Sequence, residues 1–478
     1  MNQPETASVI SSSAEVSSAE YFAQRQLKQG TVGWLLLIGL GVAYVISGDF
    51  AGWNFGIAQG GWGGMFIATA LAALMYLCLC LSMSEMSTMM PTAGGGYSFA
   101  RAAFGPFGGY LTGTAILIEY AIAPAAIAVF IGDYCESLFG INGWMIYLAC
   151  YAIFMGIHLK GAGEALKIMF AITLVAAVAL VVFIGAMIPH FNAQNLFDIP
   201  ASTGVGASLF LPHGYLGIWA AVPFAIWFFL AVEGVPLAAE EAKDPAKSLP
   251  RGLIGAMLIL TAFAMLILFL GAGAAGASTL QNSGAPLVDS LVKVYGTNTW
   301  LATFVNFVGL AGLIASFFSI IYAYSRQIFA LSRAGYLPTS LSLTNKNKAP
   351  YLAIIIPGII GFLLSLTKEG DSLILIAVFG ATISYVLILL SHIKLRLSKP
   401  DMPRPYKTPG GIITSSIALV LAVAAVVAGF VVNPKVWFIA ASIYVVFIAY
   451  FLFYSRYHLV KGTPEEEFAN IKAAEQEL

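Results

Sequence analysis

Long apolar stretches, separated by short polar connections, run along most of this chain. A transmembrane helix needs about 20 apolar residues to cross the hydrocarbon core of a bilayer. Measured against that length, the pattern predicts an all-α, polytopic membrane protein. Its twelve predicted spans are residues 31–57, 62–88, 103–131, 141–158, 164–189, 214–237, 253–276, 298–330, 351–367, 371–395, 411–432 and 435–455.

The remaining segments suggest how the chain is organised. Residues 1–30 are polar, which predicts a disordered tail, and the first apolar run is too long for the core of a signal peptide. We expect two five-helix units joined by an extracellular loop, then helices 11 and 12 and a second cytoplasmic tail. In chain order these parts are residues 31–189, 190–213, 214–397, 398–455 and 456–478.

Lysine and arginine are distributed unevenly between the two sides of the predicted bundle. With the N-terminus inside, only Lys293, Lys368 and Lys435 lie outside, and the other 20 of the 23 basic residues lie at the inner side. Inner loops of membrane proteins carry an excess of basic residues. We therefore predict that both termini are cytoplasmic and that the membrane is a plasma membrane, such as a bacterial inner membrane.

Composition agrees with this class and excludes others. The chain is 59% hydrophobic and only 10% charged, with mean hydropathy +0.86 and a net charge of zero, so no basic face is available for nucleic acid. Its histidines and cysteines have no metal-ligand spacing, and Gly94-Gly95-Gly96 lacks the lysine of a phosphate-binding loop. We expect neither an enzyme nor a bound metal or cofactor.

The first span contains the polar sequence Ser47-Gly48-Asp49-Phe50. A charge at the centre of a membrane helix costs roughly 2.5–3.5 kcal/mol, and glycine weakens helical continuity. Such a segment is tolerated where the helix is broken and lines a protein-buried cavity. Asp49 either contacts a positively charged substrate or caps the second half of the broken helix.

The sixth span contains a similar interruption, with Glu233 and Gly234 followed by Pro236. Spans 1 and 6 correspond if spans 1–5 and 6–10 form two halves, and an odd number of spans inverts the second half. Paired interrupted helices of this kind mark the midplane site of transporters with inverted repeats. The alternative is two unrelated kinked helices.

Two further groups of residues belong to the predicted site. Glu119, near the middle of span 3, is an ammonium contact, a proton carrier or a neutral hydrogen-bonded acid. The position of Glu233 beside the break in span 6 favours a gating or proton-linked role for it. Ser316 and Ser319 share a face of span 8, where they coordinate sodium or bond within their own helix. The predicted substrate contacts are Ser47, Gly48, Asp49, Phe50, Glu119, Tyr120, Trp227 and Leu230, and the predicted coupling or gating residues are Glu233, Gly234, Ser316 and Ser319.

Three segments resemble signatures of the amino acid–polyamine–organocation permeases. They are Pro91-Thr-Ala-Gly94-Gly95-Gly96-Tyr97 after span 2, residues 238–251 after span 6 and residues 325–338 after span 8. The resemblance implies the leucine-transporter type of 5+5 inverted repeat, with broken helices 1 and 6 and substrate between spans 1, 3, 6, 8 and 10. Some proton-coupled relatives carry a lysine in the core of span 5, whereas Lys160 and Lys167 lie near its cytoplasmic end, which leaves H+ and Na+ open as coupling ions.

Within that superfamily, residues 44–56 and 225–236 look like those of ethanolamine permeases. Amino acid carriers hold a substrate carboxylate at the span 1 break, and Asp49 would repel one. The hypothesis is therefore a secondary transporter that imports ethanolamine, choline or similar small amines by alternating access. The rivals are a cationic amino acid or polyamine permease on the same fold, and an amine-binding membrane receptor that does not transport.

Overall fold

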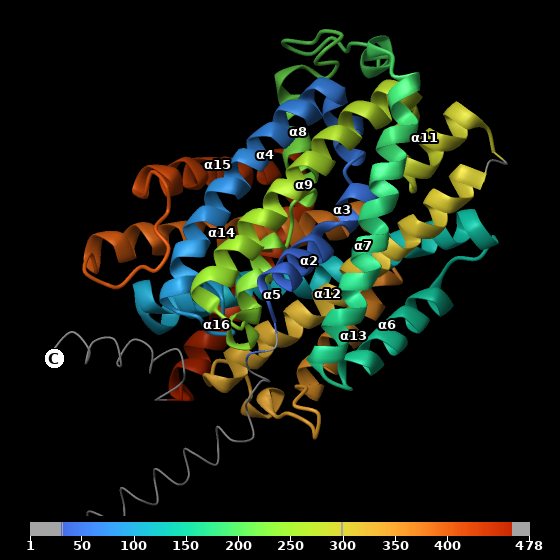
Figure 1. Ribbon diagram of the computed structural model, residues 1–478. Coiled ribbons are helices and arrows are strands. Elements are labelled where there is room, and N and C mark those ends of the chain that lie inside the picture. The colour runs from blue at the N-terminus through green and yellow to red at the C-terminus, as the bar shows by residue number, and fades with distance from the viewer. Residues whose placement is uncertain (1–29, 31, 298–299, 461–478) are drawn as a thin grey trace, which may run out of the picture.

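The structure is a computed structural model that describes residue 30, residues 32–297 and residues 300–460. In these ranges the chain folds into helices that pack side by side in one bundle (Figure 1), and the only β-type pairing is an isolated bridge between Val32 and Ala242. Most of both predicted tails, residues 1–29 and 461–478, lies outside the described residues.

Nine helical segments of the described chain are long and apolar enough to cross a membrane. They are α4 (Phe55–Met89), α5 (Gly96–Phe139), α7 (Ala162–Met187), α8 (Gly214–Trp227) with its continuation η3 (Val232–Glu241), α9 (Pro245–Ala275), α12 (Trp300–Arg333), α14 (Gly370–Ser398), α15 (Ile412–Val432) and α16 (Pro434–Phe453). Three shorter apolar helices, α2 (Trp34–Val45), α6 (Trp144–His158) and α13 (Tyr351–Ser365), occupy the predicted spans 1, 4 and 9. The polytopic helical class is thus confirmed, while the count of twelve spans and the inverted repeat stay predictions.

Several predicted boundaries differ from the structure. Helix α4 begins at Phe55, before the predicted residue 62, and α5 begins at Gly96, before residue 103. Both extensions end at a glycine with positive φ, Gly61 at 67° and Gly105 at 75°, where the helix axis changes. The connections also hold short helices: η1 (Ile188–His190), η2 (Ala193–Phe197), α10 (Ala277–Leu280), α11 (Pro286–Tyr295), η4 (Thr339–Ser342) and η5 (Ser455–Tyr457).

The centre of the bundle is built from helices distant in the sequence. Helix α14 packs along α5, α4 along α8, and α2 along α9. Helix α3 (Ser47–Phe50) follows α2 and is buried over its whole length. The interrupted segments therefore lie inside protein, where broken backbone is tolerated in a membrane.

Candidate functional site

Both predicted helix interruptions are present. Helix α2 ends at Val45, α3 covers one turn, and the backbone is extended at Ala51 (φ −157°, ψ 157°) before α4 begins. Helix α8 ends at Trp227, and η3 starts after Ala231, which has a left-handed φ of 77°. A positive φ is strained for a residue with a side chain, so the break at Ala231 is imposed by its surroundings.

The two interruptions contact each other directly. The indole Nε1 of Trp227 donates a hydrogen bond to the carbonyl oxygen of Ala51 at 3.0 Å. A β-carbon at Gly48 would lie 2.6 Å from the carbonyl oxygen of Trp227, so only glycine permits this approach. The rings of Trp53 and Phe228 also stack, with centroids 5.5 Å apart. The two interrupted segments thus pack directly against each other.

Ser316 of α12 bridges the first break. Its hydroxyl donates to the carbonyl oxygen of Ala43 at 2.7 Å and accepts from the amide nitrogen of Ser47 at 2.9 Å. Ser316 therefore supplies backbone partners that the interrupted helix lacks. Ser319 instead donates to the carbonyl oxygen of Ser316 at 3.0 Å, which is the bond within the helix that the sequence left open as an alternative.

Phe50 lies against the same helix. β-Carbons at Gly309 and Gly312 would lie 3.1 and 2.3 Å from its ring, so these glycines make room for it. Its carbonyl oxygen accepts a hydrogen bond from the hydroxyl of Tyr134 at 2.9 Å. The ring is thereby fixed between α3 and α12.

Asp49 is fully buried, and neither of its carboxylate oxygens has a hydrogen-bond partner among the described residues. The cap at the start of α4 is not made by Asp49, because no backbone amide donates to it. A buried carboxylate without partners is costly, which makes this position one that a ligand can satisfy.

Glu119 of α5 and Glu233 of η3 form a pair of neighbouring carboxyl groups. They lie close enough to interact with each other, and Glu119 also faces the backbone amide of Ala231 at the second break. Tyr120 donates to Glu233 Oε1 at 3.4 Å. Asp49 is not among the charged groups that face either glutamate in the described chain.

Tyrosines from four helices surround this pair. The hydroxyls of Tyr44, Tyr76, Tyr120 and Tyr385 all lie near enough to Glu233 to interact electrostatically. Tyr76 and Tyr385 share a hydrogen bond of 2.8 Å, whereas the Tyr44 hydroxyl has no partner in the described chain. Gly234 lets two of the rings approach, because a β-carbon there would lie 3.0 Å from Tyr44 and 3.1 Å from Tyr120. Leu230 is buried in the break itself.

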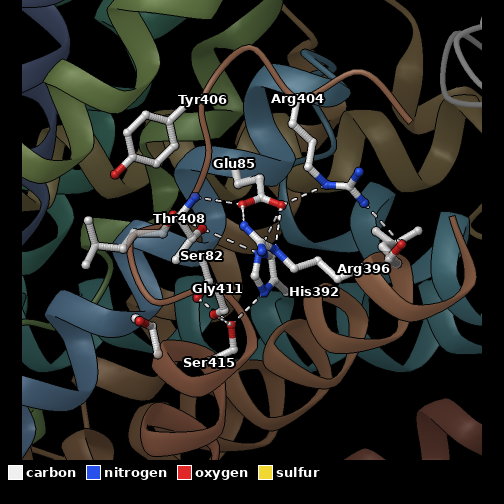
Figure 2. Close-up of polar contacts among 12 residues, drawn as sticks. Ser82, Glu85, His392, Arg396, Arg404, Tyr406, Thr408, Gly411 and Ser415 are labelled. Atoms are coloured by element: carbon white, nitrogen blue, oxygen red, sulfur yellow. Dashed lines mark hydrogen bonds and ion pairs between the residues drawn. The ribbon is translucent and has the colours of Figure 1, made fainter. Parts of the chain in front are cut away.

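Sequence reasoning did not single out several polar residues that the structure reveals. Asn54 accepts from the amide of Gly52 at 3.2 Å and donates to the carbonyl oxygens of Leu280 and Ser283, both at 2.8 Å. Glu85 lies in an ionic cluster with His392, Arg396 and Arg404, as Figure 2 shows. Asn54 has a local signal, because it follows the glycine of the first break. Glu85 has none, because its partners lie more than 300 residues away.

Two more ion pairs connect segments that the sequence did associate with a family. Arg326 of α12 contacts Glu241 at 2.8 Å, and Arg333 contacts Glu240 at 2.7 Å. Both glutamates lie at the end of η3, and Glu240 also accepts from the amide of Ala93 at 2.9 Å. The quoted segments after spans 2, 6 and 8 therefore meet in space at the predicted cytoplasmic side.

Comparison with known proteins assigns the family. The sequence profile described as "Amino acid permease" matches residues 32–453. This chain belongs to that family. Relatives of this permease include the branched-chain amino acid permease BcaP of Bacillus subtilis (strain 168), which is 28% identical over 412 residues, or 80% of this chain and 84% of BcaP. The aromatic amino acid transport protein AroP of Escherichia coli (strain K12) is 25% identical over 397 residues, or 79% of this chain and 83% of AroP.

A third relative is an uncharacterized transporter of Rhizobium meliloti (strain 1021), 27% identical over 392 residues, which cover 80% of this chain and 83% of that protein. The family consists of transporters and not of enzymes. Its members act on small molecules in a membrane, so the buried polar residues of this permease are candidates for a transport site.

Proposed function

We propose that this permease imports ethanolamine, choline or a similar small amine across the plasma membrane by alternating access. One observation carries the proposal: Asp49 and Glu233 lie at the helix interruptions, Glu119 faces the second of them, and none of the three forms an ion pair with a basic side chain of the described chain. The buried carboxylates Glu85 and Glu241, by contrast, are each paired with arginine.

Charge complementarity favours a cationic substrate at such a site. Unpaired charges out of water are costly, and functional membrane proteins keep them for a substrate, an ion or a proton. In the proposed complex Asp49 contacts the ammonium group, and Glu119, with its neighbour Glu233, adds negative charge from a separate position. Trp227 and Phe50 form part of the wall. Polar groups at the breaks hold the hydroxyl. Aromatic rings add roughly 0.5–2 kcal/mol for each cation they face.

Alternating access requires parts that can separate, and the interruptions provide them. In the proposed cycle the ion pairs of Glu240 and Glu241 with α12 close the cytoplasmic side, and η3 moves when they open. Glu233 serves as a gating or proton-linked residue, and Ser316 is the candidate contact for sodium. Entry of a monovalent cation gains about 2.3 kcal/mol per 100 mV of membrane potential, so ion coupling is not required for accumulation.

The relatives favour a second candidate. BcaP and AroP are named for branched-chain and aromatic amino acids, so the same fold could carry an amino acid here. The sequence is also compatible with a cationic amino acid or a polyamine as the substrate. An amino acid brings a carboxylate into a site that already holds three carboxyl groups, and like charges in low dielectric repel strongly.

Uptake by purified protein in proteoliposomes separates these functions. Labelled ethanolamine is offered with unlabelled choline, putrescine, arginine, leucine or phenylalanine as competitor, with and without proton and sodium gradients. We expect ethanolamine and choline to compete best and the neutral amino acids not to compete. Stronger competition by leucine or phenylalanine would assign an amino acid substrate, and binding without uptake would indicate a receptor.

A further inference from the structure

Glu85 is the centre of a buried polar cluster at the end of α4 that is predicted to be cytoplasmic. Its carboxylate accepts from Arg396 Nε at 2.9 Å and Nη2 at 2.5 Å, from Arg404 Nε at 2.9 Å and from the amide of Thr408 at 2.7 Å. His392 Nε2 lies 3.4 Å away (Figure 2). A side chain with no solvent exposure thus has every carboxylate lone pair engaged.

The cluster joins four parts of the chain that are otherwise separate. Glu85 belongs to α4, His392 and Arg396 belong to α14, Arg404 belongs to the connection 399–411, and His392 Nδ1 lies 2.5 Å from the hydroxyl of Ser415 on α15. The guanidinium of Arg404 also donates to four backbone carbonyl oxygens, those of Leu395, Lys399, Pro400 and Met402. The connection is therefore held to the ends of α4 and α14 by directed bonds.

The same two helices meet again inside the candidate site. Tyr76 lies nine residues before Glu85 on α4, and Tyr385 lies seven residues before His392 on α14. At about 1.5 Å per residue these intervals are roughly 10–14 Å along the two helices. Tyr76 and Tyr385 hydrogen-bond to each other at 2.8 Å and face Glu119 and Glu233. Helices α4 and α14 are thus connected by polar bonds at two levels.

We propose that Glu85, Arg396 and Arg404 are positioning residues for the transport site. By fixing α4 against α14 at one end, they hold the Tyr76–Tyr385 pair beside the two glutamates. None of the three touches the site itself. A slide or rotation of α14 relative to α4 would separate the tyrosine hydroxyls, because a hydrogen bond weakens steeply with misalignment.

A double-mutant cycle tests this connection. The variants are Glu85→Gln, Tyr385→Phe and both together, and the readouts are substrate Kd and the KM and maximal rate of uptake in proteoliposomes. We expect each single variant to raise Kd by about tenfold and the double variant to be no worse than either, because the two changes disturb one arrangement. Additive losses, about a hundredfold in the double variant, would overturn the proposal.

Controls separate positioning from general stability. Asp244→Asn removes an exposed ion pair with Lys247 at the same side and should leave Kd unchanged. If Glu85→Gln does not fold, Arg396→Lys replaces it, because lysine keeps the positive charge but cannot make the bidentate contact with the Glu85 carboxylate. With either variant, a lowered melting temperature together with a normal Kd would also overturn the proposal.

The proposal rests on the proposed transport function, but not on the identity of the substrate. The cycle uses whichever compound of the competition panel the wild-type protein takes up. If that compound is an amino acid, the amine assignment fails and the cycle still decides whether Glu85 acts through Tyr385.

Discussion

Replacing Asp49 by asparagine tests the amine site most directly. The change keeps the shape of the side chain and removes its charge, at a position with no solvent exposure and no hydrogen-bond partner in the described chain. In the empty protein the carboxylate is an unsatisfied buried group, so its removal should not destabilise the fold. In the complex the same carboxylate is proposed to face the ammonium group, so its removal should weaken binding.

The expected loss of affinity follows from the kind of bond that changes. A hydrogen bond to a charged group contributes roughly 1.5–3 kcal/mol and a neutral one roughly 0.5–1.5 kcal/mol, and an amide oxygen still accepts from ammonium. Loss of the ion–ion attraction adds to the difference between the two bonds, because charges interact more strongly at a buried position than in water. A loss of about 2 kcal/mol corresponds to roughly 30-fold in Kd.

The assay pairs ethanolamine binding, by calorimetry or ligand-induced thermal shift, with the melting temperature of the empty protein. We expect Asp49→Asn to raise Kd by roughly 30-fold at an unchanged or higher melting temperature. Glu119→Gln should weaken binding in the same way, and Asp371→Asn, at an exposed position, serves as the control. A Kd for Asp49→Asn within about threefold of wild type would remove this residue from the site.

Three further outcomes are expected. Gly48→Ala should lower the melting temperature and slow uptake, because the new β-carbon would overlap the Trp227 carbonyl and overpacking costs roughly 1–3 kcal/mol. The control Gly64→Ala should be tolerated, because the nearest atom to its β-carbon would be 3.4 Å away. Ser316→Ala leaves two backbone groups of the first break without a partner and should cost about 1–3 kcal/mol in chemical denaturation, more than Ser319→Ala. Arg326→Gln should lower the melting temperature sharply and raise substrate leak from loaded proteoliposomes, since breaking a buried ion pair costs about 3–5 kcal/mol. A variant with a wild-type melting temperature and no increase in leak would contradict this.

The sequence predicts the membrane class and both interruptions because their signals are local. Apolar runs predict the spans, and a carboxylate next to a glycine predicts each break, as at Asp49 and Glu233. The contact between the two breaks is also expected if spans 1–5 and 6–10 form two halves, which stays a prediction. These inferences depend on only a few neighbouring residues each.

The sequence does not predict which side chains contact each other across the bundle. The sequence treats Ser316 and Ser319 as equivalent, yet one hydroxyl bridges to α2 and the other bonds within α12, because only one faces the broken helix. It assigns Glu119 to the ammonium without foreseeing Glu233 as its neighbour, which depends on how α5 packs beside η3. Tyr120 is among the predicted substrate contacts, but Tyr76 and Tyr385 come from two other helices, so no spacing in the sequence indicates those two.

Asn54 links the first interruption by hydrogen bonds to the connection between α9 and α11. Its amide nitrogen holds the backbone of Leu280 and Ser283, in the connection between α9 and α11, while its oxygen holds Gly52. Any reorganisation around the buried carboxylates must then move this connection as well or break those bonds. A fluorescent label at Asn282, an exposed residue of this connection, would then report on occupancy of the site.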